Sequence, residues 1–230
     1  MTAVAPAAPD AVRPAERTVP TAVLLTGGII AGPLYVIVSL GQALTRERFM
    51  LTRHAWSVLA NGDLGWIQIT NLLLTGTLLI GFALGLRRVW RSGPGRTWAP
   101  RLLAAFGVGM FAAGLLTADP SLGFPVGTPA DYREISWHGL GHMVSAMTGF
   151  VAVFACSFVV ARRFATQNRR GWAVASHVIG AGFLASFVAL SASGGQPATV
   201  VGFTVGVVAL MGGVAALAAV VRRESTRPAE

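Results

Sequence analysis

The chain has 230 residues, of which 53% are hydrophobic and only 12% charged, and its mean hydropathy of +0.63 is too high for a soluble domain of this size. Its net charge of +9 comes from arginine alone, and the arginines lie at the borders of apolar runs. This distribution argues against nucleic-acid binding and indicates a membrane protein. The single cysteine, Cys156, excludes an intrachain disulfide and a cysteine-based metal motif.

Residues 1–19 are rich in alanine and proline and are predicted to form a flexible cytoplasmic tail. Six largely uncharged stretches follow, each of about 20 residues, the length that a helix needs to cross a bilayer. The predicted spans are 20–43, 64–86, 101–118, 136–161, 172–191 and 198–221, and residues 222–230 form a second tail. The last two spans come from one apolar run that SASGGQP, at 191–197, divides with a turn. The prediction is an all-α, polytopic six-span bundle.

The distribution of arginine predicts the orientation of this bundle. With both termini in the cytoplasm, fourteen arginines lie in cytoplasmic segments and four lie outside, namely Arg46, Arg48, Arg53 and Arg133. Tryptophans near the span ends are typical of interfacial anchors. The lysine-free composition is typical of a high-GC bacterium. We therefore expect a multi-pass protein of the bacterial cytoplasmic membrane.

Two Gly-x-x-x-Gly segments, GFALG at 81–85 and GFTVG at 202–206, favour close helix contacts. The sequence leaves open whether these contacts form within one chain or between copies, so the oligomeric state is open as well.

The two long outer loops carry most of the unusual polar residues. The second loop leads into WHGLGH at 137–142, where the spacing i, i+4 places His138 and His142 on one helix face, about 5–6 Å apart. His142 lies ~8 Å below the interface, and an ionisable group at that depth is a candidate functional residue. The pocket candidates are His142, His138, Asp119, Ser57, Asp63, Gln68 and Asn71.

Each candidate also has a structural interpretation. His138 is interpretable as an interfacial residue paired with Glu134, and His142 as an interhelical hydrogen bond that fixes packing. Asp119 either satisfies backbone N–H groups of its loop or faces His142 and orients its ring. For Asp63 we favour a helix N-cap. For the pair formed by Gln68 and Asn71, which share a helix face, we favour polar contacts between helices over ligand binding.

Three segments of the chain together resemble a known family. They are SVLANGDLGWIQITNLLLTGTLLIGFALGL (57–86), GLLTADPSLGFPVGTP (114–129) and SWHGLGHMVSAMTGF (136–150). They are similar to the DUF998 family of integral membrane proteins over about residues 20–221. The matching positions are Ser57, Leu59, Gly76, Asp119, Pro120, Gly139 and His142. The resemblance implies a six-helix membrane fold and carries no established activity.

Two functions remain open at this point. The first is an outward-facing polar pocket around His142, Asp119 and His138 that binds a membrane lipid or a small molecule. The alternative is an intramembrane metal-dependent hydrolase acting on a lipid amide or ester, in which His54, His138 and His142 bind Zn²⁺ and Asp119 lies near the bound water. Alkaline ceramidases and progestin-receptor-like hydrolases also use an aspartate and a His-x-x-x-His pair, but with seven helices and a different motif order. A proton-coupled carrier is disfavoured, because the inner halves of the spans offer little polar lining.

Overall fold

The computed structural model describes residues 19–226, and within them it has six long helices and no β-strand. The helices are α1 (Thr21–Thr45), α2 (Gly65–Val89), α3 (Trp98–Leu115), α4 (Trp137–Thr166), α5 (Arg170–Ala192) and α6 (Pro197–Ser225), and a short 3-10 helix, η1 (Trp56–Ala60), precedes α2. All six are long and apolar enough to cross a membrane. The prediction of an all-α, six-span bundle is therefore confirmed.

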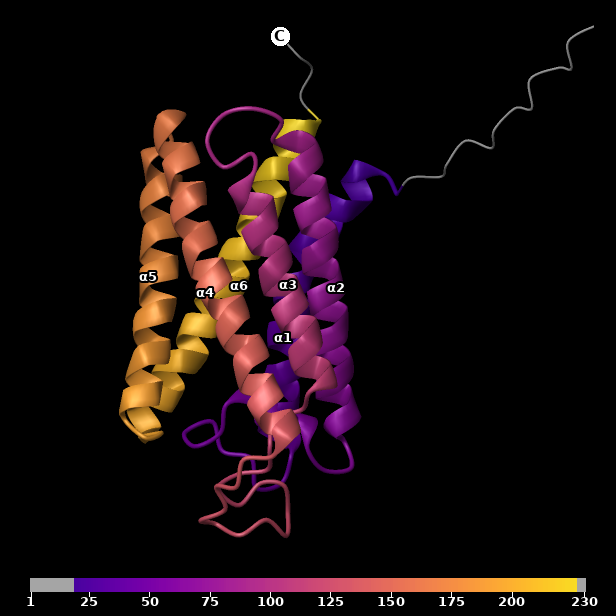
Figure 1. The fold of residues 1–230 in the computed structure, drawn as a ribbon, viewed down its shortest axis with the longest axis vertical. Helices are drawn as coiled ribbons and strands as arrows, with labels where there is room; N and C mark the ends of the chain where they lie inside the picture. Colours follow the sequence, from indigo (N-terminus) through magenta and orange to yellow (C-terminus); the bar gives the residue numbers. More distant parts are fainter. Residues whose placement is uncertain (1–18, 227–230) are drawn as a thin grey trace, which may run out of the picture.

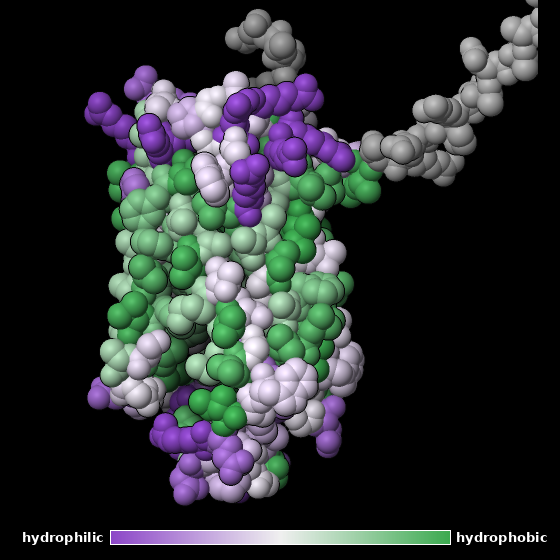
Figure 2. Space-filling view, viewed as in Figure 1, coloured by the Kyte–Doolittle hydropathy of each residue, from purple (hydrophilic) through white to green (hydrophobic). Residues whose placement is uncertain are grey.

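The six helices form a closed ring. Each packs against the next along the chain, and α6 crosses the bundle obliquely to pack against α1 (Figure 1). Residues 46–64 and 116–136, which we call the cap, cover one end of the ring, where the α5–α6 turn also lies. The start of α1 and the end of α6 lie at the opposite end, together with the α2–α3 and α4–α5 connections. Figure 2 shows hydrophobic residues over the middle of one face and hydrophilic residues at both ends.

The helix boundaries differ from the predicted spans in an informative way. α3 begins at Trp98, three residues before the predicted start, because Pro100 lies in its first turn, where proline is tolerated. It ends at Leu115 rather than at residue 118. α4 and α6 continue past the predicted ends to Thr166 and Ser225, since arginines are favourable in the last turn of a helix. Counting uncharged residues gives the length of the apolar stretch, whereas the helix itself can extend beyond it. The predicted tail 1–19 lies almost wholly outside the described residues, and α6 continues into the second predicted tail.

Both Gly-x-x-x-Gly segments contribute to contacts within the chain. Gly85 of α2 packs against Leu24 and Leu25 of α1, and Gly206 of α6 packs against Ser186 of α5. Gly202, by contrast, has no neighbouring heavy atom within 4 Å of the position that a Cβ would take. At least one glycine of each segment therefore lies in a contact between neighbouring helices of the ring.

Candidate functional site

Hydrogen bonds to backbone carbonyls hold the first half of the cap in shape and connect it to the second half. Arg46, just after α1, donates from Nη1 to the Leu59 carbonyl at 2.6 Å and from Nη2 to the Asn61 carbonyl at 2.7 Å. The Asn61 amide donates in turn to the carbonyl of Ala118 at 2.9 Å. The Arg46 guanidinium also stacks on the ring of Phe124, 4.8 Å from its centroid. The cap therefore has a defined position over the helix ends.

His54 is a structural member of this cap. Its Nδ1 accepts the backbone N–H of Met50 at 3.0 Å, and its Nε2 lies 3.2 Å from the carbonyl of Leu122, so Nε2 carries the hydrogen. The ring is only 1% exposed and packs between Phe49 and Phe124. Burial lowers the pKa of His54 below its ordinary 6.5, opposed in part by the hydrogen bond to Leu122. Both ring nitrogens of His54 are thus already engaged.

Asp119 supports the start of α4. Its Oδ2 accepts the backbone N–H of Ser136 at 2.9 Å, and its Oδ1 accepts the Ser136 hydroxyl at 2.6 Å. Ser136 is the N-cap of α4, since its Oγ accepts the N–H of Gly139 at 3.1 Å. A side chain on Gly139 would overlap the Asp119 carboxylate. The first glycine of GLGH therefore allows this carboxylate to approach the positive end of the α4 dipole.

The two histidines of WHGLGH hold the end of α3. The Nδ1 atom of His138 lies 3.0 Å from the Thr117 carbonyl, and that of His142 lies 2.9 Å from the carbonyls of both Ala113 and Leu116. These carbonyls belong to the last turn of α3 and the residues after it, where a helix leaves acceptors without intrahelical partners. The two histidines are four residues apart, and so are Thr117 and Ala113, whose carbonyls they contact on the facing segment. The expected role of His142 in packing is thus present in the structure.

His138 differs from its predicted pairing. Its Nδ1 atom lies 3.6 Å from Asp119 Oδ1, and Glu134, the expected partner, is exposed on the loop. Asp119 for its part binds Ser136, not His142. The predicted pairing of His138 with Glu134 is therefore wrong, whereas Asp119 accepts a backbone N–H, as its structural interpretation expected, although from Ser136 at the start of α4.

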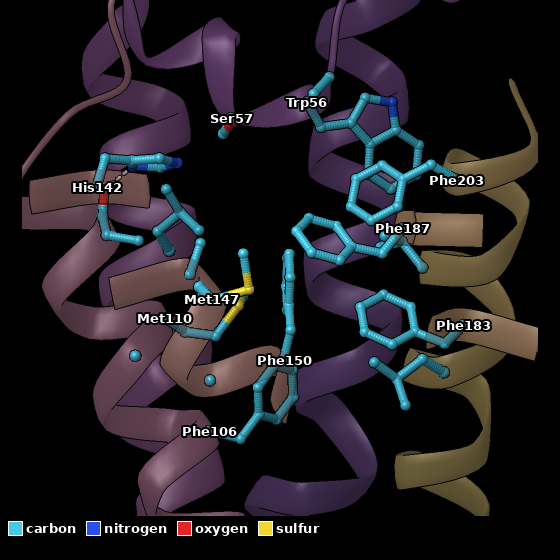
Figure 3. A pocket seen from close by; sticks show the side chains of 18 of the residues that line it. Trp56, Ser57, Phe106, Met110, His142, Met147, Phe150, Phe183, Phe187 and Phe203 are labelled. Carbon is cyan, nitrogen blue, oxygen red and sulfur yellow. Dashed lines mark hydrogen bonds between the residues drawn. The ribbon is translucent and has the colours of Figure 1, made fainter. Parts of the chain in front are cut away.

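Two cavities meet beside His142. The first is apolar, measures about 270 Å³ and lies inside the ring near the cap, and we call it the chamber. Aromatic and methionine side chains form much of its wall, and Figure 3 shows Phe150, Phe187 and Phe203 facing Met110 and Met147 across it. The second, which we call the vestibule, is an open space of about 310 Å³ under the α3–α4 loop, lined in part by Asp119, Tyr132, Arg133 and Glu134.

Three residues line both cavities: Ser57, His142 and Met143. We call them the neck. In Figure 3 the His142 ring points into the pocket from one side, and Ser57 lies at its rim. The site therefore has an apolar interior, a polar neck and a charged outer opening. The pocket around His142 is consequently much less polar inside than the sequence predicted.

Among the other pocket candidates, Asp119 lines only the vestibule, and His138 lines neither cavity. Asp63 is exposed and also lines neither. Its predicted role as N-cap is wrong, because Leu64 holds that position and no side chain caps α2. Because α2 begins at Gly65, Asp63 lies one residue before the N-cap position, and its carboxylate does not cap the helix.

Gln68 and Asn71 lie buried between α1 and α2, away from both cavities. The Asn71 amide donates to the Ser39 hydroxyl at 3.1 Å, and Gln42 donates to Gln68 Oε1 at 2.9 Å. This network consists of polar contacts between helices, which is the interpretation that the sequence favoured for Gln68 and Asn71.

The four residues predicted to bind zinc do not form a metal site, although His138 and Asp119 lie close to each other. Within residues 19–226 no group of three or more His, Cys, Asp or Glu side chains is placed to hold a metal ion. The physical reason lies in the hydrogen bonds already described: His54 uses both nitrogens within the cap, and Asp119 uses both oxygens on Ser136. The zinc centre of the hydrolase alternative is thus not formed in this structure.

Most chamber residues escaped the sequence analysis. Phe150, Phe183, Phe187 and Phe203 form a contiguous aromatic group, with ring centroids 5.0 to 6.0 Å apart. In a membrane helix an apolar residue is equally compatible with lipid and with an apolar cavity, so hydropathy gives no signal for them. A weak signal was available in the loop, where the large aromatic residue Trp56 directly precedes the candidate Ser57.

Comparison with known proteins agrees with the fold. No curated protein and no solved structure matches the chain. The model of one protein family, described as a protein of unknown function (DUF998), matches residues 29–222, a segment that contains the neck, the cap and most of all six helices. This match confirms the resemblance found in the sequence. The chain belongs to the DUF998 family.

Proposed function

We propose that this membrane protein binds a lipid-like molecule with a single hydrocarbon chain, which occupies the chamber while its polar head lies at the neck. The observation that carries the proposal is the shared wall of the two cavities, which places an apolar space directly beside polar side chains. A molecule with an apolar part for the chamber and a polar part for the neck is an amphiphile. We further propose that it acts in the cytoplasmic membrane of a bacterium, with the cap on the outer side.

The size and lining of the chamber support a hydrocarbon chain as its occupant. An apolar cavity of about 150 Å³ already binds benzene, and such cavities stay dry. The chamber, at about 270 Å³, is larger. Its aromatic and methionine side chains provide dispersion contacts without requiring a fixed ligand shape.

Access from the lipid phase also supports the proposal. Met143 and Met147 line the chamber, yet they are 55% and 46% exposed on the surface of the ring. Both belong to the first turns of α4, next to the cap. A chain in the adjoining membrane leaflet therefore has an apolar route inward that avoids water.

Two neighbouring residues of α6 provide a matched test. Val207 is 8% exposed and lines the chamber, whereas Val208 is 41% exposed and does not line it. Val207→Phe is expected to fill part of the chamber, and Val208→Phe to add the same side chain on the lipid side. We expect 1-dodecanol to remain bound to wild-type protein in native mass spectrometry, to bind about tenfold more weakly to Val207→Phe, and to bind normally to Val208→Phe.

Equal occupancy of dodecanol in both phenylalanine variants would contradict a site in the chamber. Thermal unfolding of each variant in the same detergent separates this result from a loss of folding, because filling a cavity without strain does not lower the unfolding temperature.

A further inference from the structure

The structure defines the hydrogen-bonding character of the neck. Carbonyl oxygens only accept hydrogen bonds, so the Nδ1 atom of His142, 2.9 Å from two of them, carries a hydrogen. The His142 ring forms no ion pair with any residue between 19 and 226, and the chamber beside it contains no charged side chain. A neutral ring suits this environment, and in a neutral imidazole the other nitrogen, Nε2, is an acceptor.

This acceptor has no partner among the described residues. No donor lies within hydrogen-bond distance of Nε2, although His142 is only 6% exposed. The atom is also not enclosed by protein, since it does not belong to the fully buried unpartnered polar atoms. Because the His142 ring points into the pocket in Figure 3 and lines both cavities, this atom faces the space at the neck. Leaving a partly buried acceptor without a donor costs free energy that a ligand can recover.

The charges around the neck restrict the ligand further. The vestibule is lined by two carboxylates, Asp119 and Glu134, against one guanidinium, Arg133. An anionic head at the neck would face this negative surplus on one side and an apolar wall on the other. Ser57, the second polar residue of the neck, is uncharged. Its hydroxyl has no hydrogen-bond partner among the described residues and is available to donate to an oxygen atom.

We propose that the head group of the ligand is an uncharged hydroxyl, which donates its hydrogen to His142 Nε2 and accepts one from Ser57. This inference rests on the proposed function and specifies its ligand as a long-chain alcohol or a similar hydroxyl-bearing lipid, in preference to a fatty acid or a phospholipid. His142 thus has two functions, since Nδ1 holds the end of α3 and Nε2 selects the ligand.

Three probes with the same dodecyl chain test the head group: 1-dodecanol, dodecyl methyl ether, which has no hydrogen to donate, and dodecanoate, which is anionic. We expect wild-type protein to bind the alcohol about tenfold more tightly than the ether or the carboxylate, in line with one hydrogen bond to a buried acceptor. His142→Asn keeps a side-chain N–H for the α3 carbonyls but removes Nε2. In this variant the alcohol and the ether should bind equally.

The outcomes separate the inference from the proposed function. Equal binding of alcohol and ether to wild-type protein, lost in Val207→Phe, overturns the hydroxyl assignment and leaves the chamber as a chain-binding site. Tighter binding of dodecanoate overturns it as well. If neither neutral probe binds wild-type protein, the proposed function itself fails.

A second measurement uses only the wild-type protein, so it does not depend on how well a variant folds. In wild-type protein with ¹⁵N-labelled histidine, the Nε2 resonance of His142 should have the position of an unprotonated nitrogen and should shift when dodecanol is added, but not when the ether is added. An Nε2 that carries hydrogen in the ligand-free protein would overturn the inference, because it has no lone pair to offer.

Discussion

The neighbours of the three histidines near the cap decide which ring nitrogen carries the hydrogen and whether the other one is engaged. His54 carries its hydrogen on Nε2 and accepts at Nδ1, whereas His138 and His142 both donate from Nδ1 to carbonyls at the end of α3. Spacing along the chain does not distinguish these states, because it gives no information on which backbone groups face each ring. Only at His142 does the second nitrogen face a cavity, and this distinguishes a ligand-binding candidate from two structural residues.

The cap is expected to lose stability on acidification through His54. Burial lowers the pKa of this residue in the folded protein below 6.5, so the folded state binds fewer protons than the unfolded state as the pH falls below that value. The contribution of His54 is therefore fully present above pH 6.5. It decreases as the pH falls towards the lowered pKa.

His54→Gln provides the comparison, since glutamine retains an N–H donor for Leu122 but does not titrate. Thermal unfolding of both proteins in detergent, measured from neutral pH to pH ~5, should show wild type losing more stability than the variant. A difference between the two proteins that does not change with pH would refute the assignment of a neutral, buried His54. Comparing the two proteins cancels the titration of the other three histidines.

At the scale of elements, the ring closes where α1 meets α6. A methyl group on Gly32 of α1 would overlap the carbonyl oxygen of Met211 on α6. Backbone cannot move aside as a flexible side chain can, so Gly32→Ala must push the two helices apart. We expect this change to destabilise the protein by about 1–3 kcal/mol, as overpacking does.

Gly41 is the matched control on the same helix, because no neighbouring atom lies within 4 Å of the position of its Cβ. Gly41→Ala should change the free energy of unfolding by less than about 0.5 kcal/mol, as a surface substitution does. Unfolding in mixed detergent and denaturant measures both variants. Equal effects at positions 32 and 41 would show that the α1–α6 contact is looser than described.

The helices were predictable from the sequence because length and hydropathy determine which segments can cross a bilayer. Their contacts were only partly predictable. Asp119 and His142 were identified as candidates because polar residues are conspicuous in an apolar context, but their partners, Ser136 and the α3 carbonyls, follow from how α4 is placed against α3. The aromatic wall of the chamber was not predictable, since Phe183 or Phe203 would suit a lipid-facing position equally well.

At the scale of the whole molecule, the distribution of arginine gives the two ends of the bundle different character. Within the described residues, most arginines lie at the end opposite the cap. Two of them make contacts between segments at this end: Arg169 pairs with Glu224, and Arg163 donates to the carbonyls of Ser92 and Pro94. Positive residues near span ends remain on the cytoplasmic side during insertion. We therefore expect the cap, with the vestibule, to face outward.

Single-cysteine labelling measures this orientation directly. Cys156 is the only cysteine and is buried, so Cys156→Ser gives a background without thiols. Ala130→Cys adds an exposed thiol in the cap, and Gln167→Cys adds one at the α4–α5 connection. A membrane-impermeant maleimide should label the first in intact cells and the second only after lysis. The reverse pattern would place the cap in the cytoplasm and direct the neck to the inner leaflet, while labelling of both in intact cells would mean that the chain inserts in two orientations.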